Sequence, residues 1–203
     1  EGIAALFMPP LMAHLRVHAP GVLVNVQPSD NRRLREYLEE NRAQLALSFV
    51  SAPPPKLRAS TLYPQRVCCI ASRNHKVIRR SLSMEDFLAF PHVSWGAEPI
   101  PHPAIETMLD EALRARGLER KIGIRVPSLL LTPEIVASTD MIATLPERLA
   151  RRSLPVLPIQ IFEPPLELGA ADISMFWHER THRDPFSIWL RQLLRELAQK
   201  LGR

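Results

Sequence analysis

The sequence predicts an α/β fold of two lobes, and three observations support the prediction. Strand and helix patterns alternate along most of the 203 residues, which is typical of βαβ units with mostly parallel sheets. A polar stretch at 73–80 and an apolar strand at 173–178 indicate two crossings of the chain between lobes. An amphipathic helix closes the chain, and we expect it to return to the first lobe.

The first fifty residues read as helix, strand, helix and strand. The opening helix contains Pro9-Pro10, which we expect to break it or to begin a fresh first turn. Valines alternate at 22, 24 and 26, which predicts a strand. Capping residues at 29–30 begin a helix that ends at Asn41. The apolar run 45–50 is typical of a strand buried on both faces of a parallel sheet.

The middle of the chain repeats this alternation. We expect strands at 59–63 and 66–72, then a short helix that Ser83 opens. A strand at 92–95 leads to a helix that begins at Pro103 and stops at Gly117, with one apolar stripe along its length.

In the last third, apolar residues alternate strictly with other residues at 122–126, which predicts a strand with one exposed face. Residues 128–138 are helical with a restart at Thr132-Pro133, and a strand at 141–145 ends at Pro146. Prolines between 155 and 165 indicate irregular chain. Asp184-Pro185 is a strong helix start, because Asp caps well and Pro fits the first helical position.

Composition excludes several classes of protein. With 46% apolar and 23% charged residues, the chain has material for a core and is neither disordered nor a membrane protein. No apolar run reaches the roughly 18–20 residues of a bilayer span. The net charge is +5, but no run of five or six like charges occurs. The distribution therefore favours a solvated basic face over a nucleic-acid-binding surface.

No enzyme, cofactor or metal site stands out. The chain has no Gly-rich phosphate loop and no GxSxG nucleophile elbow. A metal shared by His14 and His18 is a weak alternative to two surface residues, and the same holds for His178 and His182. The adjacent cysteines Cys68-Cys69 are interpreted as structural thiols of a reducing compartment, with a redox pair as the alternative.

The residues at the ends of the predicted strands suggest a ligand site instead. In open α/β sheets, ligands bind beyond the carboxyl ends of the strands and near helix N-termini. In a two-lobe protein these ends can face one cleft, and small hydroxyls beside aromatic rings suit a small, partly polar ligand. Taken singly, each serine is better explained as a helix cap, and only the recurrence of such residues at strand ends favours a ligand site. The candidates are Ser29, Asp30, Ser48, Phe49, Trp95, Gly96, Ser128, Thr144 and Phe176.

Several motifs, in their order and spacing, resemble the regulatory domain of LysR-type transcriptional regulators, and most of all the branch of nodulation activators and regulators of aromatic catabolism. The resemblance spans essentially the whole chain, although Asn41 and Gln44 stand where the family often has Gly and Asp. It rests on Met8-Pro9-Pro10-Leu11, Pro20 with Val22–Val26, Asn41–Leu47, Asp140 with Met141–Pro146, and Asp184-Pro185-Phe186 with Trp189-Leu190.

The resemblance implies two Rossmann-like lobes with a hinge, like type 2 periplasmic binding proteins, and an effector pocket between them. Lobe I would comprise residues 1–73 and 178–203, and lobe II residues 74–177. The family's winged helix-turn-helix is not part of these 203 residues, so we expect DNA contact only through that absent N-terminal domain. The implied effector positions are Gly2, Ile3, Ser29, Asp30, Trp95, His102, Ser128, Leu129 and Phe176.

The leading hypothesis is therefore a cytoplasmic effector-sensing domain that binds a small aromatic or acidic metabolite and signals to a DNA-binding domain. By resemblance, it would form a homodimer or tetramer through the helices Ala4–His18 and Pro103–Arg116. The alternative of the same architecture is an exported solute-binding protein, which would be a monomer with a signal peptide. An enzyme on this scaffold would need converging titratable groups, and the candidate residues are mostly hydroxyl or apolar.

Overall fold

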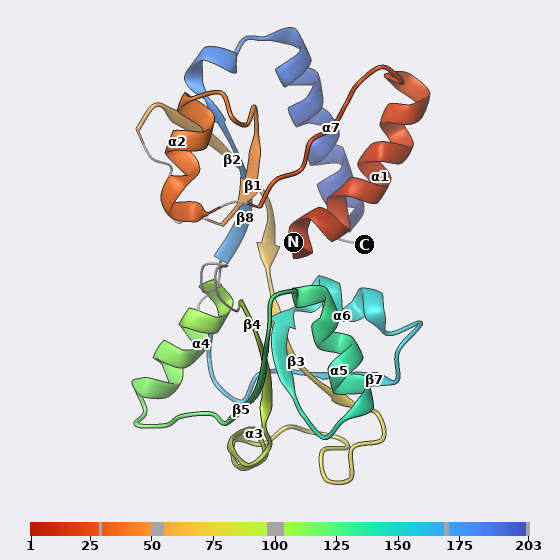
Figure 1. The fold of residues 1–203 in the computed structure, drawn as a ribbon, viewed down its shortest axis with the longest axis vertical. Helices are drawn as coiled ribbons and strands as arrows, with labels where there is room; N and C mark the ends of the chain where they lie inside the picture. The colour runs from red at the N-terminus through yellow and green to blue at the C-terminus, as the bar shows by residue number, and fades with distance from the viewer. Residues whose placement is uncertain (29, 50–54, 97–103, 169–170, 202–203) are drawn as a thin grey trace. The chain divides into compact units, whose positions relative to one another are not determined.

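A computed structural model describes residues 1–28, 30–49, 55–96, 104–168 and 171–201 (Figure 1). The chain divides into two compact units. Unit 1 comprises Glu1, Ile3–Gln65 and Ala171–Arg203, and unit 2 comprises Gly2 and Arg66–Ala170. In the described part of the chain, no helix is both long and apolar enough to cross a membrane.

Unit 1 is built on a three-stranded antiparallel sheet. Its strands are β1 (Ala46–Ser48), β2 (Leu57–Gln65) and β8 (Ala171–His178), in the order β1-β8-β2. Helices α1 (Gly2–His18) and α7 (Pro185–Leu201) share one apolar core with Tyr63 and Ile173 of the sheet. The short η1 (Asn31–Arg33) and α2 (Leu34–Glu39) follow one another, and α2 packs on Phe176 in a second core. A single turn, η3 (Glu179–Thr181), joins β8 to α7.

Helix α1 runs through Pro9 and Pro10 without interruption, so the expected break is wrong. Both prolines lack the N–H that the helical ladder uses, which costs roughly 3 kcal/mol in a helix interior. Buried side chains on both sides of them, including Phe7 and Leu11, pack into the unit 1 core. This packing holds the helix together where local sequence alone would break it.

Unit 2 combines antiparallel and parallel pairing. Strand β3 (Val67–Ser72) lies antiparallel between β6 (Ala143–Pro146) and β7 (Ile159–Phe162). Strands β4 (His92–Trp95) and β5 (Ile122–Val126) are parallel, and a parallel bridge joins His92 to Ile142 at the start of β6. The carboxyl ends of β4, β5 and β6 therefore point to the same edge.

Helices cover both faces of the unit 2 sheet (Figure 1). On one face, α5 (Thr132–Ser138) and α6 (Glu147–Ser153) pack on β3 and β6, and the short η2 (Leu129–Leu131) joins the same core. On the other face, α3 (Met84–Ala89) and α4 (Ala104–Arg114) pack on Cys69 and Ile142.

Local signals located most elements correctly. Ser83 caps α3 by accepting from Asp86 N at 3.0 Å, and Asp184 caps α7 by accepting from Ser187 N at 2.7 Å. Asn41 adopts a left-handed φ of 60° after α2, and Gly117 one of 68° after α4. These confirm the expected starts and stops. The predicted Pro103 start lies outside the described residues.

Strand direction was predicted less well. The expected mostly parallel sheets are wrong, because β1, β2, β3, β6, β7 and β8 pair antiparallel and only β4 and β5 run in parallel as neighbouring strands of the described chain. Residues 22–26 are not assigned as a strand, since no strand of the described chain pairs with them. Helix α6 and strand β7 were not predicted, because prolines at 146–165 masked their short patterns.

The unit boundaries lie earlier in the chain than the lobe boundaries expected after residues 73 and 177. Strand β3 pairs with β6 and β7 and so belongs to unit 2. Strand β8 pairs with β1 and β2 and so belongs to unit 1. Pairing partners, which single-strand patterns do not reveal, decide both assignments.

Two apolar residues on α7 provide a test of the unit 1 core. Leu194 is 2% exposed and Ile188 is 48% exposed. We expect Leu194→Ala to lower the free energy of unfolding by about 2–5 kcal/mol, because it leaves a cavity. The matched Ile188→Ala variant should cost under about 1 kcal/mol. Equal losses in urea unfolding would contradict the assigned face of α7.

Candidate functional site

Four predicted site residues meet at the carboxyl edge of the parallel strands of unit 2. Trp95 ends β4 and pairs with Val126 at the end of β5, and Gly96 N donates to Val126 O at 2.9 Å. Gly96 has a φ of 98°, a conformation that other residues rarely adopt, so the chain can turn sharply here. After β5, Ser128 caps η2 by accepting from Leu130 N at 3.2 Å, and Leu129 is buried beside it.

The side chain of Trp95 carries an unused hydrogen-bond donor. Its ring is half-buried against the core that holds Val93, Val126 and Leu129. The indole Nε1 is buried and has no hydrogen-bond partner in the described part of the chain. An unpaired buried donor costs roughly 1–3 kcal/mol, so a ligand that offers an acceptor here would recover that free energy.

A buried carboxylate holds the end of β4 in place, and the sequence analysis missed it. Glu106 on α4 is 0% exposed. Its Oε2 accepts from Ser94 Oγ at 2.9 Å, and its Oε1 accepts from Trp95 N at 3.3 Å. Arg125 Nη1 also donates to Ser94 Oγ, at 3.3 Å. The backbone that carries Trp95 is thus fixed by a charge-assisted bond from α4.

Arg120 neutralises this carboxylate inside unit 2. Its Nη2 donates to Glu106 Oε2, and its Nε donates to Asp110 Oδ1 at 2.8 Å. Burial by itself would lower the pKa of Arg120, but the two carboxylates outweigh it and raise the pKa. The available sequence signal was the acidic i, i+4 pair Glu106 and Asp110 next to the buried stripe of α4, followed by an arginine after the Gly117 turn.

Thr144 lies on β6, on the opposite face from Trp95 and Leu129. It is fully buried, and its Oγ1 lies 3.4 Å from Cys69 Sγ. Burial raises the pKa of Cys69 to about 12 and also raises that of Cys68, and both thiols are free and buried. Thiols of this kind react slowly, so the geometry favours two structural cysteines over a redox pair.

The remaining predicted residues that the structure describes lie at the start of α1 or in unit 1. Gly2 and Ile3 form the first turn of α1. Asp30 caps η1, and the guanidinium of Arg32 lowers the pKa of its carboxyl. Ser29 and His102 lie outside the described residues.

Asn31 links two more of these residues. It accepts a hydrogen bond from Ser48 Oγ and donates to Phe49 O at 3.1 Å. Phe176, by contrast, is fully buried in the core beneath α2. The start of η1 therefore contacts the end of β1. Phe176 packs in the core below them and does not reach the surface.

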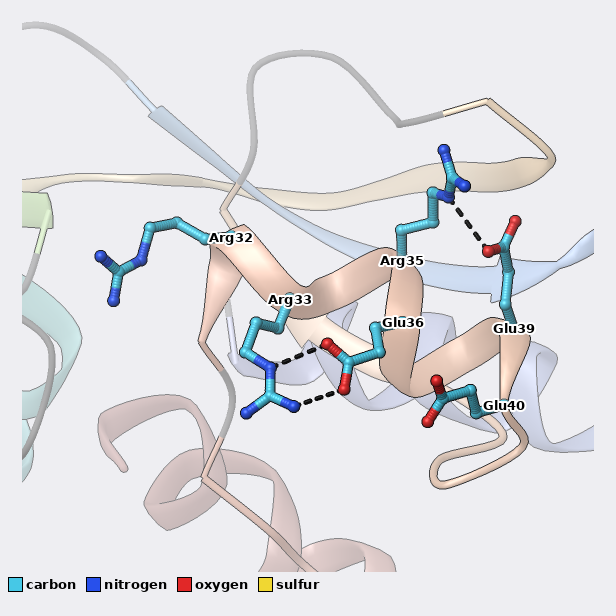
Figure 2. Close-up of a pocket in the computed structure, with 6 residues that line it drawn as sticks. All are labelled: Arg32, Arg33, Arg35, Glu36, Glu39 and Glu40. Atoms are coloured by element: carbon cyan, nitrogen blue, oxygen red, sulfur yellow. Dashed lines mark hydrogen bonds and ion pairs between the residues drawn. The ribbon is translucent and has the colours of Figure 1, made fainter.

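A surface hollow of about 430 Å³ lies on α2 and η1, and the six residues that line it include none of the predicted site residues (Figure 2). Figure 2 shows two ion pairs among its charged side chains, Arg33 with Glu36 and Arg35 with Glu39, the latter at 3.0 Å. Arg32 and Glu40 pair outside the hollow, with Asp30 and Arg42. The hollow thus has balanced, solvent-exposed ion pairs and no apolar wall. These features favour a solvated helix face over a ligand site.

The described residues contain no group of three or more potential metal ligands. His14 and His18 stack with ring centroids 4.1 Å apart, and His18 Nδ1 donates to His14 O at 3.0 Å. His178 Nδ1 accepts from Arg180 N, and His182 Nδ1 accepts from Trp177 Nε1. Each pair therefore has a local structural role.

Comparison with known proteins identifies relatives along nearly the whole chain. The family profile described as "LysR substrate binding domain" matches residues 1–199. The HTH-type transcriptional activator NagR of Ralstonia sp is 30% identical over 191 residues, which cover 94% of this chain and 62% of that protein. NahR of Pseudomonas putida, also an HTH-type transcriptional activator, is 29% identical over 191 residues, with the same coverage. The chain thus spans less than two thirds of these relatives.

A solved structure extends the match to the fold. The regulatory domain of MexT, a transcriptional activator in Pseudomonas aeruginosa, superposes with a TM-score of 0.78 at 24% identity, covering 94% of this chain and 92% of that one. The predicted class, an α/β fold like type 2 periplasmic binding proteins, is confirmed. The relatives are regulators and not enzymes, as the sequence analysis expected.

His92 generates a testable pH dependence. Burial lowers its pKa to about 4, and its Nε2 donates to Phe87 O at 2.8 Å. In the unfolded chain His92 is protonated below about pH 6.5, whereas in the folded chain it is protonated only below about pH 4. The free energy of unfolding should therefore fall across this window by up to about 3 kcal/mol, whereas it is unaffected by His92 above pH 6.5.

Urea unfolding between pH 7 and pH 4 checks this. The His92→Gln variant lacks the titrating group, so its stability should fall less steeply with decreasing pH than that of the wild type. Parallel curves for the two proteins would show that His92 does not titrate in this way.

Proposed function

Since the chain belongs to the LysR substrate-binding domain family, we propose that it senses a small-molecule effector on behalf of a longer transcriptional regulator. The DNA-binding part would lie in that longer protein, because the matched relatives are HTH-type activators of which the chain spans 62%. The alternative of an exported solute-binding protein is not favoured, since the relatives are transcriptional regulators. A cytoplasmic location follows from the same proposal.

One observation carries the proposal: Trp95, Gly96, Ser128 and Leu129 converge at the carboxyl edge of β4 and β5, with a buried indole N–H that has no partner among the described residues. The half-buried Trp95 ring provides an apolar surface, and the indole N–H and the Ser128 hydroxyl provide polar contacts. A small aromatic acid matches this combination, because its ring can pack on Trp95 while its carboxylate accepts from the indole.

Signalling then requires that the effector bind two conformations unequally. A ligand shifts a conformational equilibrium only by its difference in affinity for the two states. A useful switch needs about 1–3 kcal/mol of coupling. Glu106 is suited to transmit such a difference, since its carboxylate joins the backbone of Trp95 to helix α4.

The second part of the proposal concerns assembly. We propose a homodimer or tetramer that uses α1 and α4, the second of which is the described part of the helix expected at 103–116. Half-buried apolar side chains remain on both helices, among them Met12 on α1 and Met108 on α4. An interface that covered them would gain roughly 25 cal/mol for each Å² of apolar surface removed from water.

Effector binding can be tested by thermal shift with benzoate, salicylate and matched aliphatic acids. A ligand at 100 times its dissociation constant should stabilise the chain by about 2.7 kcal/mol. Trp95→Phe retains a ring but removes the donor, so it should weaken binding about tenfold or more. Ser128→Ala should also weaken binding, whereas Trp189→Phe on α7 is the control and should bind like the wild type.

Two results would contradict the proposed site. One is the absence of stabilisation by every acid in the panel. The other is a dissociation constant that neither Trp95→Phe nor Ser128→Ala changes.

Assembly can be tested by light scattering at tens of micromolar protein. Met108→Glu places a charge on the half-buried face of α4, so we expect the dimer or tetramer to dissociate to monomers. Arg114→Gln makes the same change in net charge at an exposed position of α4 and is expected to leave the mass unchanged. A monomeric wild-type chain would contradict the proposed interface.

A further inference from the structure

We propose that the segment Arg73–Arg80, here called the basic loop, binds the phosphate backbone of duplex DNA. The basic loop contains four cations, Arg73, Lys76, Arg79 and Arg80, and no acidic residue. The net charge of the whole chain is +5, so the other residues together carry only 5 − 4 = +1. Almost the entire excess of positive charge is therefore concentrated in eight consecutive positions, 73–80.

All four cations are exposed, and none forms an ion pair with a residue of the described chain. Elsewhere, exposed arginines are often paired, as Arg33 and Arg35 are with glutamates on α2. The acids that follow most closely are Glu85 and Asp86 in α3, and Asp86 accepts from Ser83 Oγ at 2.8 Å. The cations of the basic loop thus remain available to an external anion.

The loop backbone is held by hydrogen bonds from a buried histidine and a half-buried glutamine. His75 is 4% exposed, and its Nδ1 accepts from the backbone N of Val77 and of Ile78, at 3.2 and 2.9 Å. The His75 Nε2 donates to Asp140 O at 3.1 Å. Gln160 on β7 donates to Ser72 O and Ile78 O at 3.0 and 2.9 Å. Because its backbone is already ordered, the loop loses less entropy on binding phosphates than a flexible segment would.

The basic loop lies at the opposite edge of unit 2 from the candidate effector site. It follows the carboxyl end of β3, and β3 runs antiparallel to β6. Because β6 is bridged in parallel to β4, the loop lies near the amino ends of these strands, away from the carboxyl end of β4 (Figure 1). The two surfaces are separate, so the DNA proposal does not depend on the identity of the effector.

The matched relatives favour DNA as the polyanion, because they are HTH-type regulators. In a longer protein that holds DNA through another domain, even a weak contact would matter, since tethering raises the effective concentration to about the millimolar range. The contact would not depend on the DNA sequence, because the phosphate groups are the same at every base pair. The proposal departs from two sequence-based expectations, a solvated basic face and DNA contact only through the N-terminal domain, because the structure places four cations on one ordered loop without ion pairs in the described chain.

Fluorescence anisotropy of the 203-residue chain with a labelled 24-base-pair duplex of scrambled sequence tests the proposal. We expect binding at 50 mM salt that weakens steeply as salt rises. The variant Lys76→Gln, Arg79→Gln, Arg80→Gln should lower the affinity about tenfold or more and reduce the slope of log K against log salt by about 3. Circular dichroism and the melting temperature check that the variant is folded.

The variant Arg32→Gln, Arg35→Gln, Arg42→Gln is the matched control, since it removes the same charge from the paired arginines near α2. It should bind DNA within about twofold of the wild type, and equal losses in the two variants would overturn the proposal. Absence of wild-type binding at 50 mM salt would also overturn it. Val77 is an exposed apolar side chain within the loop, and such a side chain can also contact a protein. Labelled polyglutamate, which imitates an acidic protein segment, is therefore a second probe. Tighter binding of polyglutamate than of DNA would assign the loop to an acidic protein and overturn the DNA assignment.

Discussion

The geometry of unit 2 depends on one buried carboxylate. Glu106 is closed off from water, and its two oxygens accept from Ser94 Oγ, Trp95 N and Arg120. Removing Arg120 would leave the buried carboxylate uncompensated and cost about 3–5 kcal/mol. Removing Glu106 would leave Arg120 paired with Asp110 alone. An apolar pair of similar volume would fill the space, but it would not bind the Trp95 backbone. The ion pair therefore specifies where β4 ends and where the Trp95 side chain starts.

Local chemistry explains which parts of the fold were predictable. Caps such as Ser83 and Asp184 act on neighbouring N–H groups, so their effect is visible in a few consecutive residues. The continuous α1 was not predictable, because its stability through Pro9 and Pro10 comes from packing against residues of α7 that follow far along the chain. Strand direction failed for the same reason: β1 pairs with β8, and an apolar run does not reveal the direction of its partner.

The candidate site was predictable to the extent that it follows strand ends. The rule that ligands bind beyond the carboxyl ends of strands selected Trp95 and Ser128, which the parallel pairing of β4 and β5 brings to one edge. The same rule selected Thr144, whose side chain points to the opposite face and contacts Cys69. Which face a residue takes depends on register, and a single sequence does not fix register. Glu106 was missed because a buried acid resembles any helical surface acid until its partner Arg120 is placed.

The two edges of the unit 2 sheet differ in chemistry for a physical reason. At the carboxyl edge, Trp95 and Leu129 extend the apolar core outward, and the buried charge of Glu106 is neutralised internally by Arg120. At the other edge, His75 and Gln160 use neutral hydrogen bonds to fix the backbone of a loop whose cations form no ion pair within the described chain. The apolar edge, with the unpaired indole N–H of Trp95, is suited to a small ligand that matches its shape and offers one acceptor. The edge that carries the basic loop is suited to polyanions, which it attracts by charge. Because one sheet supports both edges, a small domain can offer a metabolite and a polyanion separate surfaces that do not compete.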